Sequence, residues 1–297
     1  MSVNVSTATR APVIGAPRVR ASQAFKRLWA NPSGRIGLLM LTAMVIAAAA
    51  APLLAPYSPN TQDYTHIMQA PNSHSLLGTD DLGRDILSRV LYGGRISLRV
   101  GALPVFVGFV IGTCIGVVAG FYRGIVDDLI MRLTDIALAF PGVLLALVVI
   151  AILGPGLTNV MIALGIADIP IAVRVSRGVV LALREEPYVQ SAIASGASDL
   201  RIMRCHLWPS VVPAVLVVFT LEVANALLIA SGLSYLGLGA SLTSPEWGAM
   251  LADGQQHIQN AWWSAVFPGV AIILAVMAVN LLGDGLRDAL DPKTMRV

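Results

Sequence analysis

Charged residues are scarce in this chain of 297 residues. Only 12% of the residues are Asp, Glu, Lys or Arg, whereas 56% are hydrophobic and the mean hydropathy is +0.75. Soluble globular domains carry about 25% charged residues. So few charges, combined with long apolar runs, exclude an ordinary soluble domain and predict a polytopic membrane protein.

Cysteine, metal-ligand spacings and nucleotide-binding motifs are missing as well. The only two cysteines, Cys114 and Cys205, lie in an apolar run and in a distant polar loop, which excludes a disulfide framework, and no histidine has a ligand partner four residues away. The chain contains no G-x-x-x-x-G-K-[ST] loop for ATP and no G-x-S-x-G nucleophile motif. We therefore expect neither a catalytic site nor a cofactor or metal in this chain.

The apolar residues gather into six segments that approach or exceed the roughly 20 residues that a helix needs to cross a bilayer. These predicted spans are residues 36–56, 100–121, 136–153, 157–173, 211–236 and 264–283. The expected fold is all-α, a bundle of six transmembrane helices over residues 36–283, with no room for a separate catalytic domain.

Basic residues predict the orientation, because Lys and Arg favour the cytoplasmic side of short loops. With six spans, most of the 20 basic residues fall on the side that holds both chain ends. The sequence thus predicts a protein of the cytoplasmic membrane with a cytosolic N-terminal tail (1–35) and C-terminal tail (284–297). The net charge of +3 reflects this topology, and we expect no nucleic-acid partner.

Four basic residues remain on the outside, in the extracytoplasmic segment 57–98 or directly after it. They are Arg84, Arg89, Arg95 and Arg99, with Asp80, Asp81 and Asp85 nearby. The pattern over 81–92 favours an amphipathic helix in the outer interface, with the charged side chains on its polar face. A re-entrant segment at this place is the alternative.

Small residues repeat every four positions in the second span. The repeat consists of Gly108, Gly112, Gly116 and Gly120. Within a membrane, such a face lets another helix backbone approach closely, so we expect it to be a helix-packing surface.

The connections around the third span also carry signals. Asp127, Asp128, Arg132 and Asp135 are spaced for ion pairs along one helix. Pro141 is expected to kink the start of the third span. The Gly-Pro-Gly at 154–156 predicts a tight turn that makes spans three and four an antiparallel hairpin.

Two carboxylates lie inside predicted spans, where a charge costs stability, so both are candidates for a functional role. Asp168 is in the fourth span; the alternative to a functional role is that it reaches toward the cytosolic end of the span or pairs with Arg174. Glu222, Asn225 and Ser231 in the fifth span are candidates for a polar translocation pathway. The alternative for Glu222 is a structural hydrogen bond to a neighbouring helix.

A polar island between two apolar segments, here called the 188–209 loop, reads YVQSAIASGASDLRIMRCHLWP. Pro187 suits the first position of a helix, and Gly196 suits the left-handed position just beyond a helix end. A second helical run follows, from Leu200 to Leu207, and we expect Pro209 to close it. The pattern predicts a compact helix–Gly–helix projection within a cytosolic segment, 174–210, on which another protein can push.

Four blocks of the chain resemble the second, C-type permease of dipeptide/oligopeptide/nickel ABC importers. They are Leu77–Leu98, Gly120–Pro141, Arg174–Pro209, and Leu233–Leu251 joined to Phe267–Pro292; they contain the motifs SYLGLG (234–239), PEWGAML (245–251) and NLLGDGLRDALDP (280–292). The resemblance implies the type I ABC importer permease fold. It also implies that the 188–209 loop inserts into a groove of an ATPase subunit through Tyr188, Gln190, Ala192, Gly196, Asp199, Ile202, His206 and Pro209. The chain departs from the family pattern at Gln190 and Ser191, where an acid and an alanine are usual, and at Ala230, where a Glu is frequent.

The resemblance further implies an assembly in which this chain performs no chemistry. A homologous permease subunit, two ABC ATPase subunits, an extracytoplasmic substrate-binding protein and membrane lipid would be its partners. ATP-driven alternating access would carry short peptides, with nickel or another small solute as the alternative cargo. A secondary transporter driven by an ion gradient is the competing class, but the halves of the chain show no persuasive internal repeat and few midplane charges.

Overall fold

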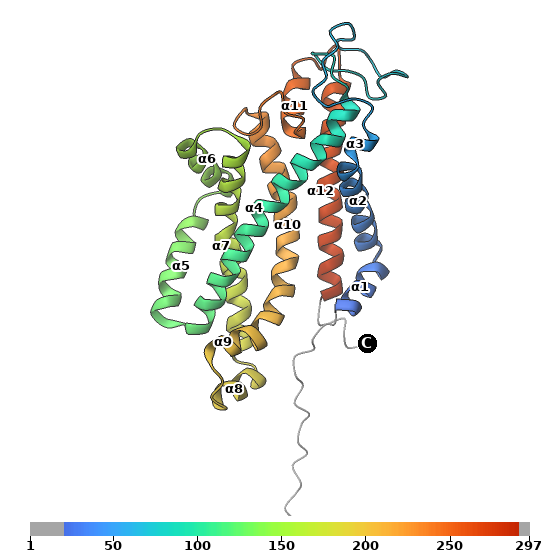
Figure 1. Cartoon of the computed structure of the whole chain (residues 1–297). Coiled ribbons are helices and arrows are strands. Elements are labelled where there is room, and N and C mark those ends of the chain that lie inside the picture. Colours follow the sequence, from blue (N-terminus) through green and yellow to red (C-terminus); the bar gives the residue numbers. More distant parts are fainter. Residues whose placement is uncertain (1–20, 291–297) are drawn as a thin grey trace, which may run out of the picture.

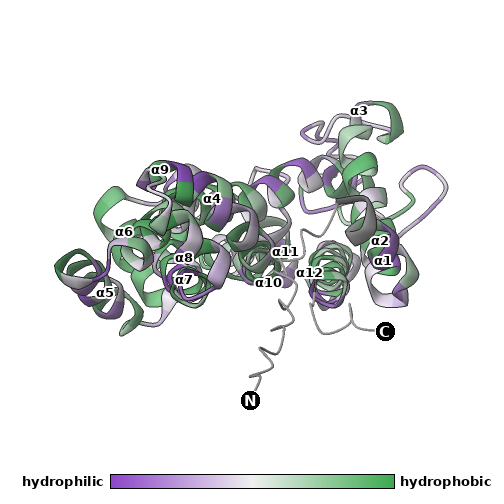
Figure 2. Ribbon diagram, turned by 90° about the horizontal axis from the view of Figure 1, so that it is seen from below, coloured by the Kyte–Doolittle hydropathy of each residue, from purple (hydrophilic) through white to green (hydrophobic). Residues whose placement is uncertain are grey.

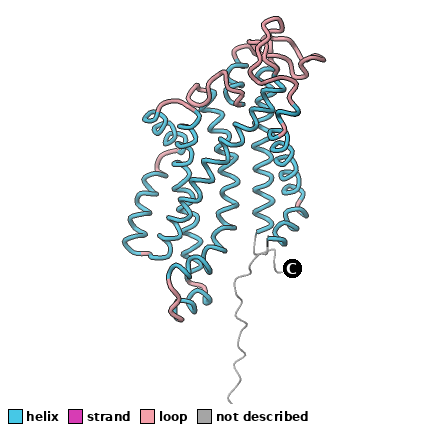
Figure 3. The backbone as a smooth tube through the Cα atoms, viewed as in Figure 1, coloured by secondary structure: helices cyan, strands magenta, loops and turns pink. Residues whose placement is uncertain are grey.

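The computed structural model describes residues 21–290, and within them the chain is helical, with no strand (Figure 3). The first twenty residues of the predicted N-terminal tail and residues 291–297 of the C-terminal tail lie outside the described part. The helices are α1 (Ala21–Ala30), α2 (Pro32–Ala49), α3 (Ala51–Leu54), α4 (Ile86–Tyr122), α5 (Gly124–Leu138), α6 (Gly142–Leu153), α7 (Leu157–Arg184), α8 (Pro187–Ala194), α9 (Asp199–Ile202), the π-helical turn η1 (Met203–Leu207), α10 (Trp208–Tyr235), α11 (Trp247–Gln255) and α12 (Trp263–Leu290).

Long apolar helices make this a membrane-spanning bundle, as predicted, and hydrophobic residues occupy much of their length in the view from below (Figure 2). Four helical stretches among the described residues are long and apolar enough to cross a bilayer, namely α2, α4, α12 and the continuous stretch Asp199–Tyr235. The pair α5 and α6 makes a fifth if it counts as one broken span. The predicted fourth span, 157–173, lies in the 28-residue helix α7. The all-α class is confirmed, whereas the number of six spans stays a prediction.

The two ends of the bundle differ in what they hold (Figure 1). The 188–209 loop lies at the lower end in that view, together with α1 and the C-terminal end of α12. The segment between α3 and α4 lies at the upper end, beside α11. Helix α4 crosses the bundle obliquely and connects the upper end to the lower end.

The glycine face of α4 receives α7 at very short range. A Cβ atom built on Gly108 would lie 2.4 Å from the carbonyl oxygen of Gly165, and one on Gly112 would lie 2.5 Å from that of Ile169. The same contact continues down the helix to Gly116 and Gly120. Because the four glycines have no side chains, the backbone of α7 fits into the groove that they form.

Helix α12 lies between α2 and α10, and it too is packed closely through glycines. Gly37 of α2 faces the backbone of α12, where a Cβ would lie 2.4 Å from the amide nitrogen of Leu282. On the other side, Gly283 meets the Thr220 side chain of α10. Close packing of small residues therefore holds both the α4–α7 and the α2–α12–α10 layers together.

The predicted amphipathic helix over 81–92 is wrong. Helix α4 begins at Ile86, capped by the Asp85 side chain, which accepts a hydrogen bond of 2.8 Å from the amide of Ser88, and then runs without interruption for 37 residues. Its first turns are not an exposed polar face, because Arg84 and Arg89 are 3% and 1% exposed. They are buried because the outer segment and α11 fold over them.

The predicted third span, 136–153, is not a single helix. Helix α5 begins earlier, at Gly124, and ends at Leu138; α6 starts at Gly142 after a bend of 89°. Pro141 precedes α6 directly, and the residue before a proline is driven away from helical geometry. The predicted kink is thus a break. The tight turn at 154–156 is confirmed, with positive φ at Gly154 and Gly156.

Candidate functional site

The first half of the 188–209 loop forms as its residues predict. Pro187 stands in the first turn of α8, and Gly196 follows the helix end with φ of +72°. The amide of Ala197 donates to the carbonyl of Ala192 at 3.2 Å, and that of Gly196 to the carbonyl of Ile193 at 3.0 Å. These two bonds are the signature of a glycine-terminated Schellman cap.

The second half of the loop differs from the prediction, because Pro209 does not close it. Helix α9 passes through η1 directly into α10, and Pro209 lies in the first turn of α10. A proline has no N–H to donate and its ring crowds the preceding turn. The wider π turn just before Pro209 lets the helix continue instead of ending.

The loop has a packed interior and an exposed polar surface. Val189, Ile202 and Leu207 are fully buried, and the ring of Tyr188 stacks on that of His206 with centroids 6.4 Å apart. The remaining residues of the predicted contact set are exposed, except for the half-buried Ala192; they are Gln190, Gly196, Asp199 and Pro209. The structure thus brings the two arms of the loop together and leaves Gly196 at its surface.

The loop is anchored to the bundle through the lower ends of α4 and α7. The Arg184 side chain, at the end of α7, donates to the carbonyl oxygen of Phe121 and stands 5.3 Å from the centre of its ring. Gln190 donates in turn to the carbonyl oxygen of Arg184 at 2.8 Å. Hydrogen bonds thus connect α8 to the end of α7, and the end of α7 to the end of α4.

The acids of α5 do not pair along their own helix as predicted. Asp127 binds Arg177 of α7, with Nη2 and Oδ2 2.6 Å apart, and Asp135 pairs with Arg174 of the same helix. Since Arg174 is engaged by Asp135, the suggested pairing of Arg174 with Asp168 is wrong as well. These two bridges tie α5 to α7.

The three pathway candidates on α10 do not share one face. Asn225 donates to the Glu222 carboxylate at 3.2 Å, and both lie on a side of α10 that the described residues leave partly open. Ser231 is buried under α11, where its carbonyl oxygen would lie 2.5 Å from a Cβ on Gly248. The geometry therefore groups Glu222 with Asn225 and leaves Ser231 in a packing contact.

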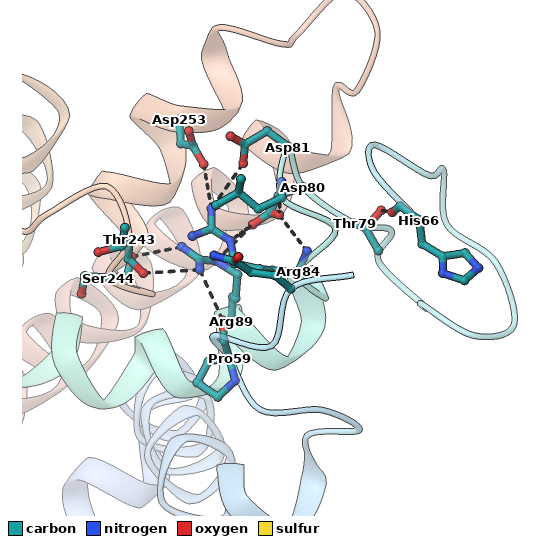
Figure 4. A network of polar contacts seen from close by, with 12 residues as sticks. Pro59, His66, Thr79, Asp80, Asp81, Arg84, Arg89, Thr243, Ser244 and Asp253 are labelled. Atoms are coloured by element: carbon teal, nitrogen blue, oxygen red, sulfur yellow. Dashed lines mark hydrogen bonds and ion pairs between the residues drawn. The ribbon is translucent and has the colours of Figure 1, made fainter. Parts of the chain in front are cut away.

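Two arginines at the end of the bundle opposite the 188–209 loop are the centres of a buried polar network (Figure 4). Arg84 pairs with Asp80 at 2.6 Å, Asp81 at 3.3 Å and Asp253 at 3.2 Å. The Arg89 guanidinium donates to the carbonyl oxygens of Pro59, Thr243 and Ser244. The network joins the segment before α4, the start of α4, the α10–α11 connection and α11, and its acids and carbonyl oxygens neutralise and bond the two arginines.

The acids of this network are not arranged around an empty cation site. Carboxylate oxygens of Asp80, Asp81 and Asp253 lie within 4.8 Å of one another. The guanidinium of Arg84 bonds to all three and supplies the positive charge itself. With three acids against two arginines, the cluster holds one negative charge in excess. Burial, and next the charge of Asp81, raise the pKa of Asp253 to about 6.

We expect Asp253→Asn to raise the melting temperature of the detergent-solubilised protein at a pH of about 7.5. The pKa of Asp253 is about 6 in the folded protein and about 4 in the unfolded chain. Its protonation therefore stabilises the fold fully below pH about 4, and this stabilisation is lost as the pH rises through about 6. The variant should therefore also shrink the change in melting temperature between pH about 5 and about 7.5. Asp128→Asn, at an exposed position, is the control and should change neither. A lower melting temperature of Asp253→Asn at pH about 7.5 would contradict this.

The sequence analysis identified most of the charged residues in these ion pairs, but it did not predict which of them pair with each other. Arg84 and Asp253 are 169 positions apart, and Arg177 and Asp127 are 50 apart. No local spacing connects such residues. The one available signal was that the predicted topology places Arg84 and Arg89 on the side of the membrane where basic residues are rare.

Comparisons with known proteins agree with this architecture. Residues 112–296 match the family model of the binding-protein-dependent transport system inner membrane component. Residues 20–71 match the model described as the N-terminal TM domain of oligopeptide transport permease C. The two matches together leave only residues 72–111 of the described part uncovered.

Individual relatives are similar over most of their length. The chain is 44% identical to a dipeptide transport system permease protein of Alkalihalophilus pseudofirmus over 271 residues, covering 91% of this chain and 89% of the relative. It is 46% identical to a glutathione transport system permease protein of Pectobacterium atrosepticum over 257 residues, covering 86% and 85%. It is 42% identical to a di/tripeptide transport system permease protein of Pseudomonas aeruginosa over 276 residues, covering 91% of each.

One solved structure is similar in fold. It is an inward-facing conformation of the MetNI methionine ABC transporter, with a TM-score of 0.52 and 20% sequence identity. The similarity covers 68% of this chain and 96% of the matched chain. The helical bundle is thus a fold of the ABC importer permease type.

Proposed function

This chain belongs to the family of binding-protein-dependent transport system inner membrane components, and from that premise we propose that it is the permease subunit of an ATP-driven importer of short peptides. It is a multi-pass membrane protein. Its residues line part of the translocation pathway, and ATP hydrolysis takes place in other subunits. We propose that two ATPase subunits supply the energy, that a homologous permease completes the path, and that an extracytoplasmic binding protein delivers the peptide.

The observation that carries the proposal is the 188–209 loop. It is a packed helical unit that projects from one end of the bundle, with exposed residues at its surface and a direct link to α7 through Arg184 and Gln190 (Figure 1). A rigid projection of this kind can convert movement of an ATPase subunit into movement of the helix that is packed into the glycine groove of α4.

Short peptides are the cargo class that we propose, because the similar permeases are named for dipeptides, di/tripeptides and glutathione. Nickel or another small solute remains the alternative within the same family. Membership in a binding-protein-dependent family argues against the competing class of secondary transporters driven by ion gradients.

Co-purification followed by reconstitution tests the proposal directly. We expect the tagged chain to bring two ATPase subunits and a second permease with it. The complex, placed in proteoliposomes with its binding protein, should accumulate a labelled dipeptide only when ATP is present on the ATPase side. Purification of the chain without ATPase subunits, or uptake that follows an ion gradient and ignores ATP, would contradict the proposal.

We propose further that the end holding the 188–209 loop is cytosolic. The native Cys205 is exposed on this loop and is a ready probe, once Cys114 has been replaced by Ala. An impermeant thiol reagent should label Cys205 only after cells are permeabilised. In a variant that also lacks Cys205, single cysteines at Asn60 and Ser244 should react in intact cells. Labelling of Cys205 in intact cells would reverse the orientation. A single cysteine at Thr294, in the predicted cytosolic C-terminal tail, should not react in intact cells; this position lies outside the described residues.

A further inference from the structure

Asp168 is a buried carboxylate that no other residue of the described chain satisfies. It stands in the middle of α7 and is 8% exposed, and its Oδ2 atom is buried without a hydrogen-bond partner. Helix α4 closes over it, since a Cβ on Gly108 would lie 3.2 Å from the Cβ of Asp168. An unpaired carboxylate in a membrane-spanning bundle costs stability and persists where function requires it.

The charged neighbour of Asp168 is another acid. Helix α10 packs against α7 and carries Glu222, the charged group that acts on Asp168. The two arginines that follow Asp168 on its own helix are engaged elsewhere, Arg174 by Asp135 and Arg177 by Asp127. Two carboxylates on adjacent helices thus share one region of the bundle, and no basic side chain among the described residues is paired with either of them.

The surroundings of the pair offer acceptors and open to one side. Glu222 is half-buried and is bonded by Asn225, which is exposed on the same side of α10. Lipid is a poor solvent for an exposed acid and amide, so this face must meet water, cargo or a polar partner. Pro170, two residues after Asp168, lacks an N–H, so the carbonyl oxygen of Ile166 one turn earlier has no helical donor and is a further acceptor.

We propose that Asp168 and Glu222 form a cation subsite of the translocation pathway that receives the ammonium group of a peptide on its way through. This rests on the proposed function, which it deepens by naming the chemical group that the path recognises. An ammonium fits because it donates three hydrogen bonds and accepts none, and the pair offers acceptors only. A hard divalent cation takes six or more oxygen ligands, of which the two carboxylates supply only a part, whereas an ammonium needs only a few acceptors.

The test uses the reconstituted full complex with a labelled dialanine, and begins with Asp168→Asn. The amide has nearly the same shape but no charge, so the variant should be at least as thermally stable as the wild type, because it no longer buries an unpaired acid. Maximal uptake should fall by about tenfold or more, with little change in the peptide concentration for half-maximal uptake, which the binding protein sets. Asp168→Glu, which keeps the charge, should restore part of the uptake.

A second variant, Glu222→Lys, separates a cation subsite from a merely structural role. Its side chain places an ammonium beside Asp168 permanently, so it should raise the melting temperature by several degrees while it abolishes uptake. Leu228→Lys is the matched control on the exposed side of the same helix, and it should lower the melting temperature because no acid receives its charge.

Failure of this inference is distinguishable from failure of the proposed function. A wild-type complex that imports no peptide with ATP would refute the proposed function. A wild-type complex that imports dialanine, together with an Asp168→Asn variant that does so within about twofold, would overturn the cation subsite alone. A Glu222→Lys variant that is less stable than the wild type would overturn it too, even where Asp168→Asn fails to fold.

Discussion

The Gly196→Val variant is expected to lose ATP-driven uptake while it reaches the membrane at the wild-type level. Insertion should be unaffected because Gly196 lies in the 188–209 loop, outside every membrane-spanning stretch. The measurement is paired: the amount of the chain in the membrane, and the amount of ATPase subunit that stays bound when the chain is purified. Uptake of labelled dipeptide is then measured in proteoliposomes.

The physical reason is the backbone conformation of Gly196. Its φ of +72° is in the left-handed region, where a side chain costs about 1–2 kcal/mol and a β-branched one is a severe outlier. The strain alone corresponds to about a tenfold loss of the native conformation of the loop. A Cβ would meet nothing within 4 Å inside this chain. The valine side chain would instead project from the surface proposed to contact the ATPase.

Gly196→Asn is the matched control for this experiment. Asparagine tolerates the left-handed conformation better than other residues with a side chain, and it also ends helices at this position. We expect it to retain most of the bound ATPase and most of the uptake, with Gly196→Ala between the two. If Gly196→Val kept normal ATPase binding and normal uptake, the 188–209 loop would not be the coupling element.

The Gly112→Leu variant is expected to lose the folded bundle rather than a single function. A Cβ at this position would lie 2.5 Å from the carbonyl oxygen of Ile169 and 2.7 Å from the Cβ of Ala172. Backbone cannot yield as a flexible side chain can, so α4 and α7 must separate. We expect a lower amount of protein in the membrane, a melting temperature lowered by many degrees, and loss of the assembled complex.

Gly178→Leu tests whether bulk or position matters. Gly178 lies on α7, is exposed, and has nothing within 4 Å of an added Cβ. The same substitution there should leave the amount of protein and its melting temperature close to those of the wild type. Equal damage by the two variants, or normal assembly of Gly112→Leu, would mean that the glycine face of α4 is not a close helix contact.

The residues that act through local geometry could be predicted from the sequence. Hydropathy predicted a helical membrane protein, and the four-residue spacing of Gly108 to Gly120 predicted a packing face. Pro187 and Gly196 marked the start and end of α8 correctly. Such features depend on the period of the helix and on the conformations that Pro and Gly allow, so a window of a few residues contains the information.

Whether a helix continues or breaks at a proline could not be predicted from the sequence. Pro209 stops an isolated helix, yet here a π turn absorbs it and α10 continues, whereas at Pro141 the chain breaks and turns by 89°. The two prolines have similar local signals and different outcomes. Before Pro209 the wider π turn accommodates the ring and the missing N–H, whereas before Pro141 the chain leaves the helical conformation.

Partners distant in the sequence were decided by the tertiary structure alone. Arg84 pairs with Asp253 and Arg177 with Asp127, whereas Asp168 has no ion-pair partner among the described residues, because α4, α5, α7, α10 and α11 pack in one particular arrangement. A sequence records which side chains carry charge, and its hydropathy records how deep in the membrane each one lies. Which charges meet depends on helix rotation and neighbour order, and these follow from close packing over the whole bundle.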